Sequence, residues 1–77
     1  MQILIRTVTG RFLVLTVSAE TTVLQLKQAI QDRDGTPVRT QALVYRAKPL
    51  IDERTLGDYA VKDNSTIDLG LRLLGGY

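Results

Sequence analysis

The sequence predicts an α+β protein, with a twisted sheet and one helix packed on one of its faces. Three observations predict this class. Two alternating apolar segments near the N-terminus are joined by a glycine turn. One segment then combines a helical apolar stripe with start and stop signals, and a strongly alternating segment lies near the C-terminus. At 77 residues, the chain is expected to form a single domain.

The first element is an N-terminal hairpin. Both MQILIRT and RFLVLTV alternate between apolar and polar positions, and Gly10 between them permits a tight turn. In such strands every second side chain points outward, and the side chains between them point toward the core. The side chains expected to face the core are Met1, Ile3, Ile5, Leu13, Leu15 and Val17.

The second element is a helix in TTVLQLKQAIQDRDG. Thr22 is a good N-cap, and Gln25 three residues later completes a capping box. Gly35 is expected just past the last turn, and Pro37 prevents continuation. The apolar stripe of this helix consists of Val23, Leu26 and Ile30.

The second half of the chain supplies the remaining strands. TQALVYR is expected to place Leu43 and Tyr45 on one face, and residues 48–65 are expected to form turns and short pieces. The inward anchors of that region are predicted to be Leu50, Leu56 and Tyr59. In TIDLGLRL the predicted inward residues are Ile67, Leu69 and Leu71, and the predicted outward ones are Thr66, Asp68, Gly70 and Arg72.

Composition excludes several functions. Without cysteine or histidine the chain lacks thiol chemistry and the usual general base, so neither a metal site nor a cofactor is expected. A net charge of +2 is too small to indicate nucleic-acid binding, and no apolar run approaches the roughly 20 residues that span a membrane. No signal peptide is recognised, which favours the cytoplasm or nucleus. Acid pairs such as Asp32 and Asp34 are typical of solvated surfaces, so no enzyme is predicted.

Several short motifs lie in one register along nearly the whole chain. They are MQI at the start, T-x-T-G at Thr7 to Gly10, IQD-x-x-G-x-P at Ile30 to Pro37, Lys48, R-T-L-x-D-Y at Arg54 to Tyr59 and L-R-L-x-G-G at Leu71 to Gly76. Together they resemble ubiquitin, without a gap from Met1 to Gly76. The resemblance implies a β-grasp domain over residues 1–72, followed by a flexible tail over residues 73–77.

The resemblance also implies a function. Ubiquitin-type modifiers are joined to lysines of target proteins through the carboxylate of their last glycine, here Gly76, by activating and conjugating enzymes. The tail residues that those enzymes and a C-terminal hydrolase would recognise match Arg72, Leu73, Gly75 and Gly76. Tyr77 is then expected to be a precursor residue removed by the hydrolase. In the alternative interpretation, Tyr77 is the first residue of a linker to a further domain.

The main docking face of the family matches Val8, Val44, Asp68 and Gly70 here, and is less apolar than usual. Gly70 contributes no side chain, although burying a valine is worth roughly 1.5–3 kcal/mol. Asp68 adds a charge that an apolar partner would have to desolvate. Ubiquitin-binding receptors are therefore expected to bind with altered, weaker affinity.

The outward side of the predicted hairpin, in contrast, is more apolar than is usual in the family. Leu4, Phe12 and Val14 fall on its outward side, within reach of one another across the strands. An exposed apolar cluster indicates a partner surface, and the alternative is ordinary cross-strand stabilisation. We call these three residues the hairpin cluster.

Only three lysines can serve as chain-linkage amines, because seven of the ten basic residues are arginines. Lys48 is the first candidate, on an expected exposed turn, and Lys62 is the second. Lys27 also matches a linkage position, but is expected to be packed or paired on the helix with Asp52. Leu74 and Ala42 replace arginines of the family, which argues against activation by the standard enzyme.

Two other classes compete with the modifier. A ubiquitin-like domain of a larger protein would recruit proteasomes or ligases noncovalently, and a sulfur carrier would end as a thiocarboxylate. The pair Gly75 and Gly76 favours the modifier over the first, and the ungapped resemblance disfavours the second. A monomer is expected.

Overall fold

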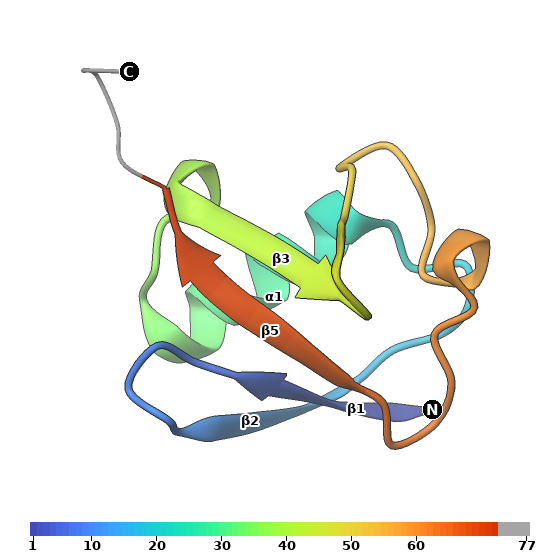
Figure 1. Cartoon of the computed structure of the whole chain (residues 1–77), viewed down its shortest axis with the longest axis horizontal. Coiled ribbons are helices and arrows are strands. Elements are labelled where there is room, and N and C mark those ends of the chain that lie inside the picture. Colours follow the sequence, from blue (N-terminus) through green and yellow to red (C-terminus); the bar gives the residue numbers. More distant parts are fainter. Residues whose placement is uncertain (73–77) are drawn as a thin grey trace.

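A computed structural model describes residues 1–72 of the chain. Its elements, in chain order, are β1 (Gln2–Arg6), β2 (Phe12–Thr16), α1 (Val23–Asp34), the 3₁₀ turn η1 (Val38–Thr40), β3 (Gln41–Tyr45), β4 (Lys48–Pro49), the 3₁₀ turn η2 (Gly57–Tyr59) and β5 (Thr66–Leu71). The strands form one sheet in the order β2-β1-β5-β3-β4, and α1 lies across one face of it (Figure 1).

The sheet is mixed. β1 pairs antiparallel with β2 and parallel with β5, while β5 pairs antiparallel with β3. The parallel pair brings the first and last strands of the described chain side by side at the centre of the sheet (Figure 1). The hairpin, the helix and the two later strands that the sequence predicts are therefore confirmed, and so is the α+β class.

The core lies between α1 and the covered face of the sheet. The predicted inward residues of the hairpin and of the helix stripe are buried or pack against the core, and so are Leu50, Leu56 and Tyr59. The sequence pattern did not identify Val61, which is also buried. The fully formed core consists of Ile3, Ile5, Leu13, Leu15, Val23, Leu26, Ile30, Leu43, Leu50, Leu56, Val61, Ile67 and Leu69.

One predicted core residue is wrong. Leu71 was expected to face inward, but it is 55% exposed at the last position of β5. Its partner across the ladder is Gln41, whose buried side chain takes the inward place beneath the helix. The alternation continues to the end of β5, whereas the cover over this last pair reaches Gln41 on β3 and not Leu71.

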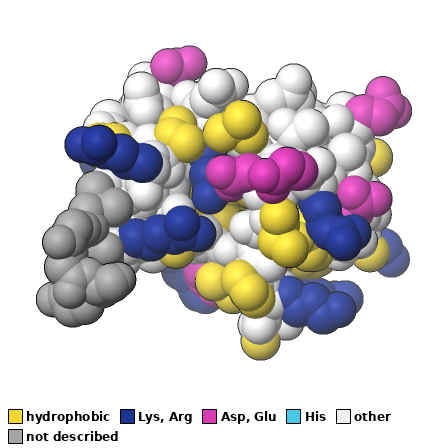
Figure 2. Space-filling model, turned by 90° about the horizontal axis from the view of Figure 1, so that it is seen from above, with side chains coloured by type: hydrophobic (Ala, Val, Ile, Leu, Met, Phe, Trp, Pro, Cys, Tyr) yellow, Lys and Arg dark blue, Asp and Glu magenta, His cyan; other side chains and the backbone are white. Residues whose placement is uncertain are grey.

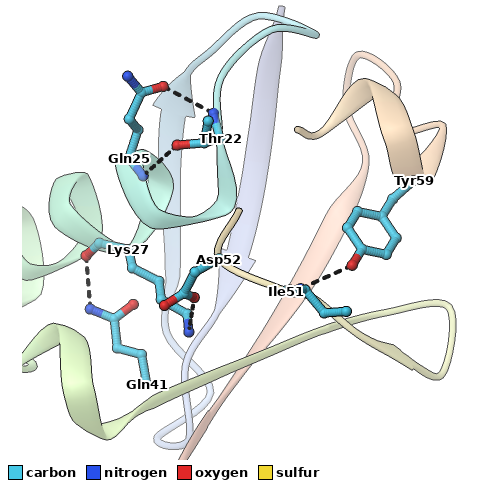
Figure 3. Close-up of polar contacts among 7 residues, drawn as sticks. All are labelled: Thr22, Gln25, Lys27, Gln41, Ile51, Asp52 and Tyr59. Carbon is cyan, nitrogen blue, oxygen red and sulfur yellow. Dashed lines mark hydrogen bonds and ion pairs between the residues drawn. The ribbon is translucent and has the colours of Figure 1, made fainter. Parts of the chain in front are cut away.

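The helix begins and ends as its signals predict. The Thr22 side chain accepts a hydrogen bond from the Gln25 N–H at 3.1 Å, and the Gln25 side chain accepts one from the Thr22 N–H at 2.9 Å (Figure 3). This reciprocal pair satisfies two N–H groups that the first turn would otherwise leave without a partner. At the other end Gly35 adopts a left-handed φ of 82°, which glycine accepts without a steric cost.

The β3–β4 connection holds two residues in the left-handed region. Arg46 has a φ of 53° and Ala47 a φ of 66°, and the short ladder resumes at Lys48. Two consecutive left-handed residues match the twist of a tight hairpin, but for L-residues that region costs roughly 1–2 kcal/mol each. The surrounding pairs therefore impose a backbone shape that neither side chain favours.

A small reciprocal contact closes the loop before η2. The Thr55 N–H donates to the Asp58 carboxylate at 3.0 Å, and the Asp58 N–H donates to the Thr55 hydroxyl at 3.1 Å. The backbone hydrogen bond from Thr55 holds the pKa of Asp58 below its ordinary value, because it stabilises the charged carboxylate.

Candidate protein-interaction surface

The face of the sheet opposite α1 is formed by the outward side chains of the strands. The strand register places Phe12 opposite Arg6, Arg6 opposite Asp68, and Asp68 opposite Val44. These four residues form one row across the sheet. A second row runs from Val14 through Leu4 to Thr66. We call this surface the outward face.

The outward face brings together three of the four residues that match the family's main docking surface. Val44 lies directly opposite Asp68, and Gly70 lies in the next outward pair, opposite Ala42. A Cβ added at Gly70 would meet only the Ala42 carbonyl oxygen, at 3.6 Å, so a side chain would fit there. Val8 lies in the β1–β2 turn and is 62% exposed.

The Asp68 carboxylate is paired, which the sequence pattern did not reveal. Arg6 Nε donates to Asp68 Oδ1 at 2.7 Å, and both side chains are about half exposed. This hydrogen bond and the charge of Asp68 raise the pKa of Arg6 above its ordinary value. A partner at this face therefore meets an ion pair and not an isolated negative charge. The parallel register of β1 and β5 is the signal that would have predicted it.

The hairpin cluster lies on the far side of that ion pair from Val44. Leu4 and Val14 are direct cross-strand partners, and Phe12 lies one outward position along β2 from Val14. Phe12 is 54% exposed and Val14 is 46% exposed, while Leu4 is half-buried. The structure thus confirms that the three side chains occupy neighbouring positions on the outward face.

The three lysines differ in access. Lys48, in β4, and Lys62 are exposed. Lys27 is buried, and its Nζ contacts Asp52 Oδ1 at 2.6 Å, which confirms the expected pairing (Figure 3). Its carbonyl oxygen also accepts a hydrogen bond from Gln41 Nε2 at 2.8 Å. As a chain-linkage candidate, Lys27 would first have to leave this ion pair and the core.

The tail candidates are only partly described. Arg72 is exposed, and its N–H donates to the Thr40 carbonyl oxygen at 2.7 Å, which fixes the backbone where β5 ends. Leu73, Gly75, Gly76 and Tyr77 lie outside the described residues.

The exposed surface of residues 1–72 is the part of the described chain that is available for binding. Within residues 1–72 no pocket is present and no group of three acidic side chains could hold a metal ion. No helix in this range has the length and apolarity needed to cross a membrane. On the face that Figure 2 shows, apolar side chains form separate patches between Lys or Arg and Asp or Glu side chains.

A mixed five-stranded sheet with one helix across it defines a ubiquitin-like β-grasp domain. The model of the ubiquitin family matches residues 3–74. The chain belongs to the ubiquitin family.

Curated relatives carry this domain within longer chains. The chain is 35% identical to "Ubiquitin-like protein 4A" of Rattus norvegicus over 74 residues, which are 96% of this chain and 47% of that protein. The same protein of Mus musculus gives the same values. "Ubiquitin domain-containing protein DSK2" of Saccharomyces cerevisiae is 42% identical over 53 residues, 69% of this chain and 14% of that protein. The chain therefore spans about half the length, or less, of these relatives.

Proposed function

We propose that this chain is a protein-interaction domain that binds its partners noncovalently through the outward face. The observation that carries this proposal is the hairpin cluster, an apolar group on a sheet face that no helix covers in the described chain. The similarity to domains within chains about twice as long or longer supports it. In this function the domain recruits a partner, such as a proteasome subunit or a ligase, and catalyses no reaction.

The energetics favour the hairpin cluster over the family's usual surface. Full burial of a Phe side chain such as Phe12 is worth roughly 1.5–3 kcal/mol, and Val14 adds apolar area beside it. Gly70 adds none, and the Arg6–Asp68 pair must be covered or kept wet. Receptors that read the usual ubiquitin surface are therefore expected to bind weakly.

The test uses two matched variants in N-terminally tagged full chains. Phe12→Ser removes an apolar side chain from the outward face, while Ile51→Ser removes an equally exposed one from the loop after β4. Partners recovered from eukaryotic cell lysate under native conditions should be lost with Phe12→Ser and retained with Ile51→Ser. Equal recovery with both variants would contradict the use of this face.

A second candidate function is supported by the sequence pair Gly75 and Gly76 and by the exposed Arg72. In that function a hydrolase removes Tyr77, and activating and conjugating enzymes join Gly76 to target lysines. Lys48 and Lys62 would then be the accessible linkage amines. For either function we expect a monomeric domain that works in the cytoplasm or nucleus.

Denaturing conditions separate the two functions. Noncovalent partners dissociate, so a blot of the tagged chain should show one band, unchanged by Gly76→Ala. A ladder of larger species that disappears with Gly76→Ala would instead assign covalent conjugation.

A further inference from the structure

β2 lies at one edge of the sheet. Its hydrogen bonds to β1 show which of its N–H and C=O groups point toward β1 and which point away from the sheet. The Val17 N–H donates to the Met1 carbonyl oxygen, and the Thr7 N–H donates to the Arg11 carbonyl oxygen, each at 2.8 Å. Hydrogen-bonded pairs alternate along an antiparallel ladder, so the odd-numbered residues of β2 bond to β1. The residues whose N–H and C=O groups point away from the sheet are Phe12, Val14 and Thr16.

The opposite edge of the sheet, formed by β4, has features that prevent a further strand from pairing with it, and the β2 edge lacks them. β4 is two residues long, carries Lys48 and ends at Pro49, and short length, lysine and proline are devices that block strand addition. β2 has five residues and contains no proline or charged residue. Its exposed edge is a template for a further strand.

One side chain within the described chain reaches this edge. Arg33 Nη1 lies 3.4 Å from the Val14 carbonyl oxygen, a long contact made by an exposed side chain. Arg11 is also exposed, and its Nη2 lies 4.0 Å from Asp34 Oδ1. Both guanidinium groups can move at little cost, because the two arginine side chains are exposed and their contacts are long, and surface ion pairs contribute about 0–1 kcal/mol. Two arginines thus lie beside a row of backbone groups that pair with no other strand in the described chain.

We propose that the β2 edge binds an extended peptide segment of a partner protein, with alternating apolar residues and acidic residues beside them. The peptide backbone pairs with Phe12, Val14 and Thr16 as a sixth strand. Its apolar side chains extend the surface of Phe12 and Val14 on the outward face. Arg33 leaves the Val14 carbonyl oxygen and forms an ion pair with a peptide carboxylate.

The charges favour this occupant over a second copy of the chain. In an antiparallel pair of two β2 strands centred on Val14, the two copies of Arg33 would approach each other, and like charges repel. An acidic peptide instead gains charge-assisted hydrogen bonds from the same groups. The ladder itself uses only backbone groups of β2, so strand pairing at this edge is tested separately from the side-chain contacts proposed for the outward face.

The test is a titration of the isotope-labelled full chain with the synthetic peptide Glu-Glu-Val-Thr-Val-Thr-Val-Gly, followed by amide NMR. The amides of Phe12, Val14 and Thr16 should shift and become protected from hydrogen exchange. Arg33→Glu should weaken binding about tenfold or more, the loss of roughly one charged hydrogen bond. Arg39→Glu, the same charge change on η1, should leave the affinity within about twofold.

Two controls can overturn the proposal. A peptide N-methylated at alternate residues keeps its charge and apolar side chains but cannot form the ladder, so its binding should be lost. Equal binding of the N-methylated peptide, or shifts centred on Val44 and Gly70, would show that the contact does not use the edge. Protection of the edge amides that rises with protein concentration and without peptide would assign the edge to a second copy and contradict the peptide as occupant.

Discussion

The two faces of the sheet are built from the same strands, but one is buried and apolar and the other is exposed and mixed in character. On the covered face, Ile3, Ile5 and Ile67 have no exposed surface. On the outward face, the same strands carry the hairpin cluster, the Arg6–Asp68 ion pair and a glycine. The covered face therefore sets stability through packing, whereas the outward face is free to carry binding. A substitution should thus affect one property or the other.

The largest effect is expected on the covered side. Ile30→Ala removes a fully buried side chain from α1 and should lower the free energy of unfolding by about 2–5 kcal/mol. Urea unfolding measures this loss. Leu24→Ala on the same helix, where the side chain is 40% exposed, is the matched control and should cost much less. Equal costs would contradict the division between the two sides.

The next effect concerns the buried ammonium group under the helix. Asp52→Asn leaves the Lys27 charge in the core without its carboxylate, which should cost about 2–4 kcal/mol. The neighbouring exposed Glu53→Gln removes the same charge from solvent and should change stability by less than about 0.5 kcal/mol. Thermal unfolding of the two variants at one pH compares them directly.

On the outward face, Phe12→Ser should lower stability by only about 0.2–1 kcal/mol, the usual worth of a cross-strand pair. Chemical unfolding checks this value. A small cost is what makes loss of partner binding by the same variant interpretable. A loss of several kcal/mol would show that the hairpin cluster belongs to the core.

The ion pair on that face should contribute less still, and only at low salt. Asp68→Asn should lower the melting temperature slightly in dilute buffer, and the difference should vanish near 1 M salt, where the Debye length is about 3 Å. A difference that persists at high salt would indicate a hydrogen bond stronger than half-exposed groups normally form.

The smallest effect on stability is expected at Asp58, which lies in η2 and on neither face of the sheet. The pKa of Asp58 is lower in the folded than in the unfolded chain, so its carboxylate adds stability above its ordinary pKa of about 3.9. That stability is lost as the pH falls through the folded-state pKa. The difference in melting temperature between the native chain and Asp58→Asn should therefore shrink as the pH falls from about 5 to 2. A constant difference would contradict the hydrogen-bond origin of the shift.

Local signals predicted the fold well, because caps and alternation act over a few residues. The capping box of Thr22 and the glycine stop at Gly35 depend on neighbours in sequence alone. The Arg6–Asp68 pair was missed because it joins residues 62 apart, through a parallel register that no local pattern specifies. Leu71 was misplaced for a related reason, since alternation gives the face of a strand but not where its cover ends.

The candidate surface was predicted in its residues but not in its arrangement. The positions of Leu4, Phe12 and Val14 follow from alternation in two adjacent strands. The free backbone edge of β2 follows only from the strand order, which places this strand outermost.

The β3–β4 turn makes chirality a direct probe of this fold. At Ala47 the native φ of 66° belongs to the region that a mirror-image residue prefers. Chemical synthesis with D-alanine at this one position changes no atom count, charge or polarity. It should nevertheless raise the melting temperature, because the handedness of the residue would then agree with the handedness that the hairpin demands.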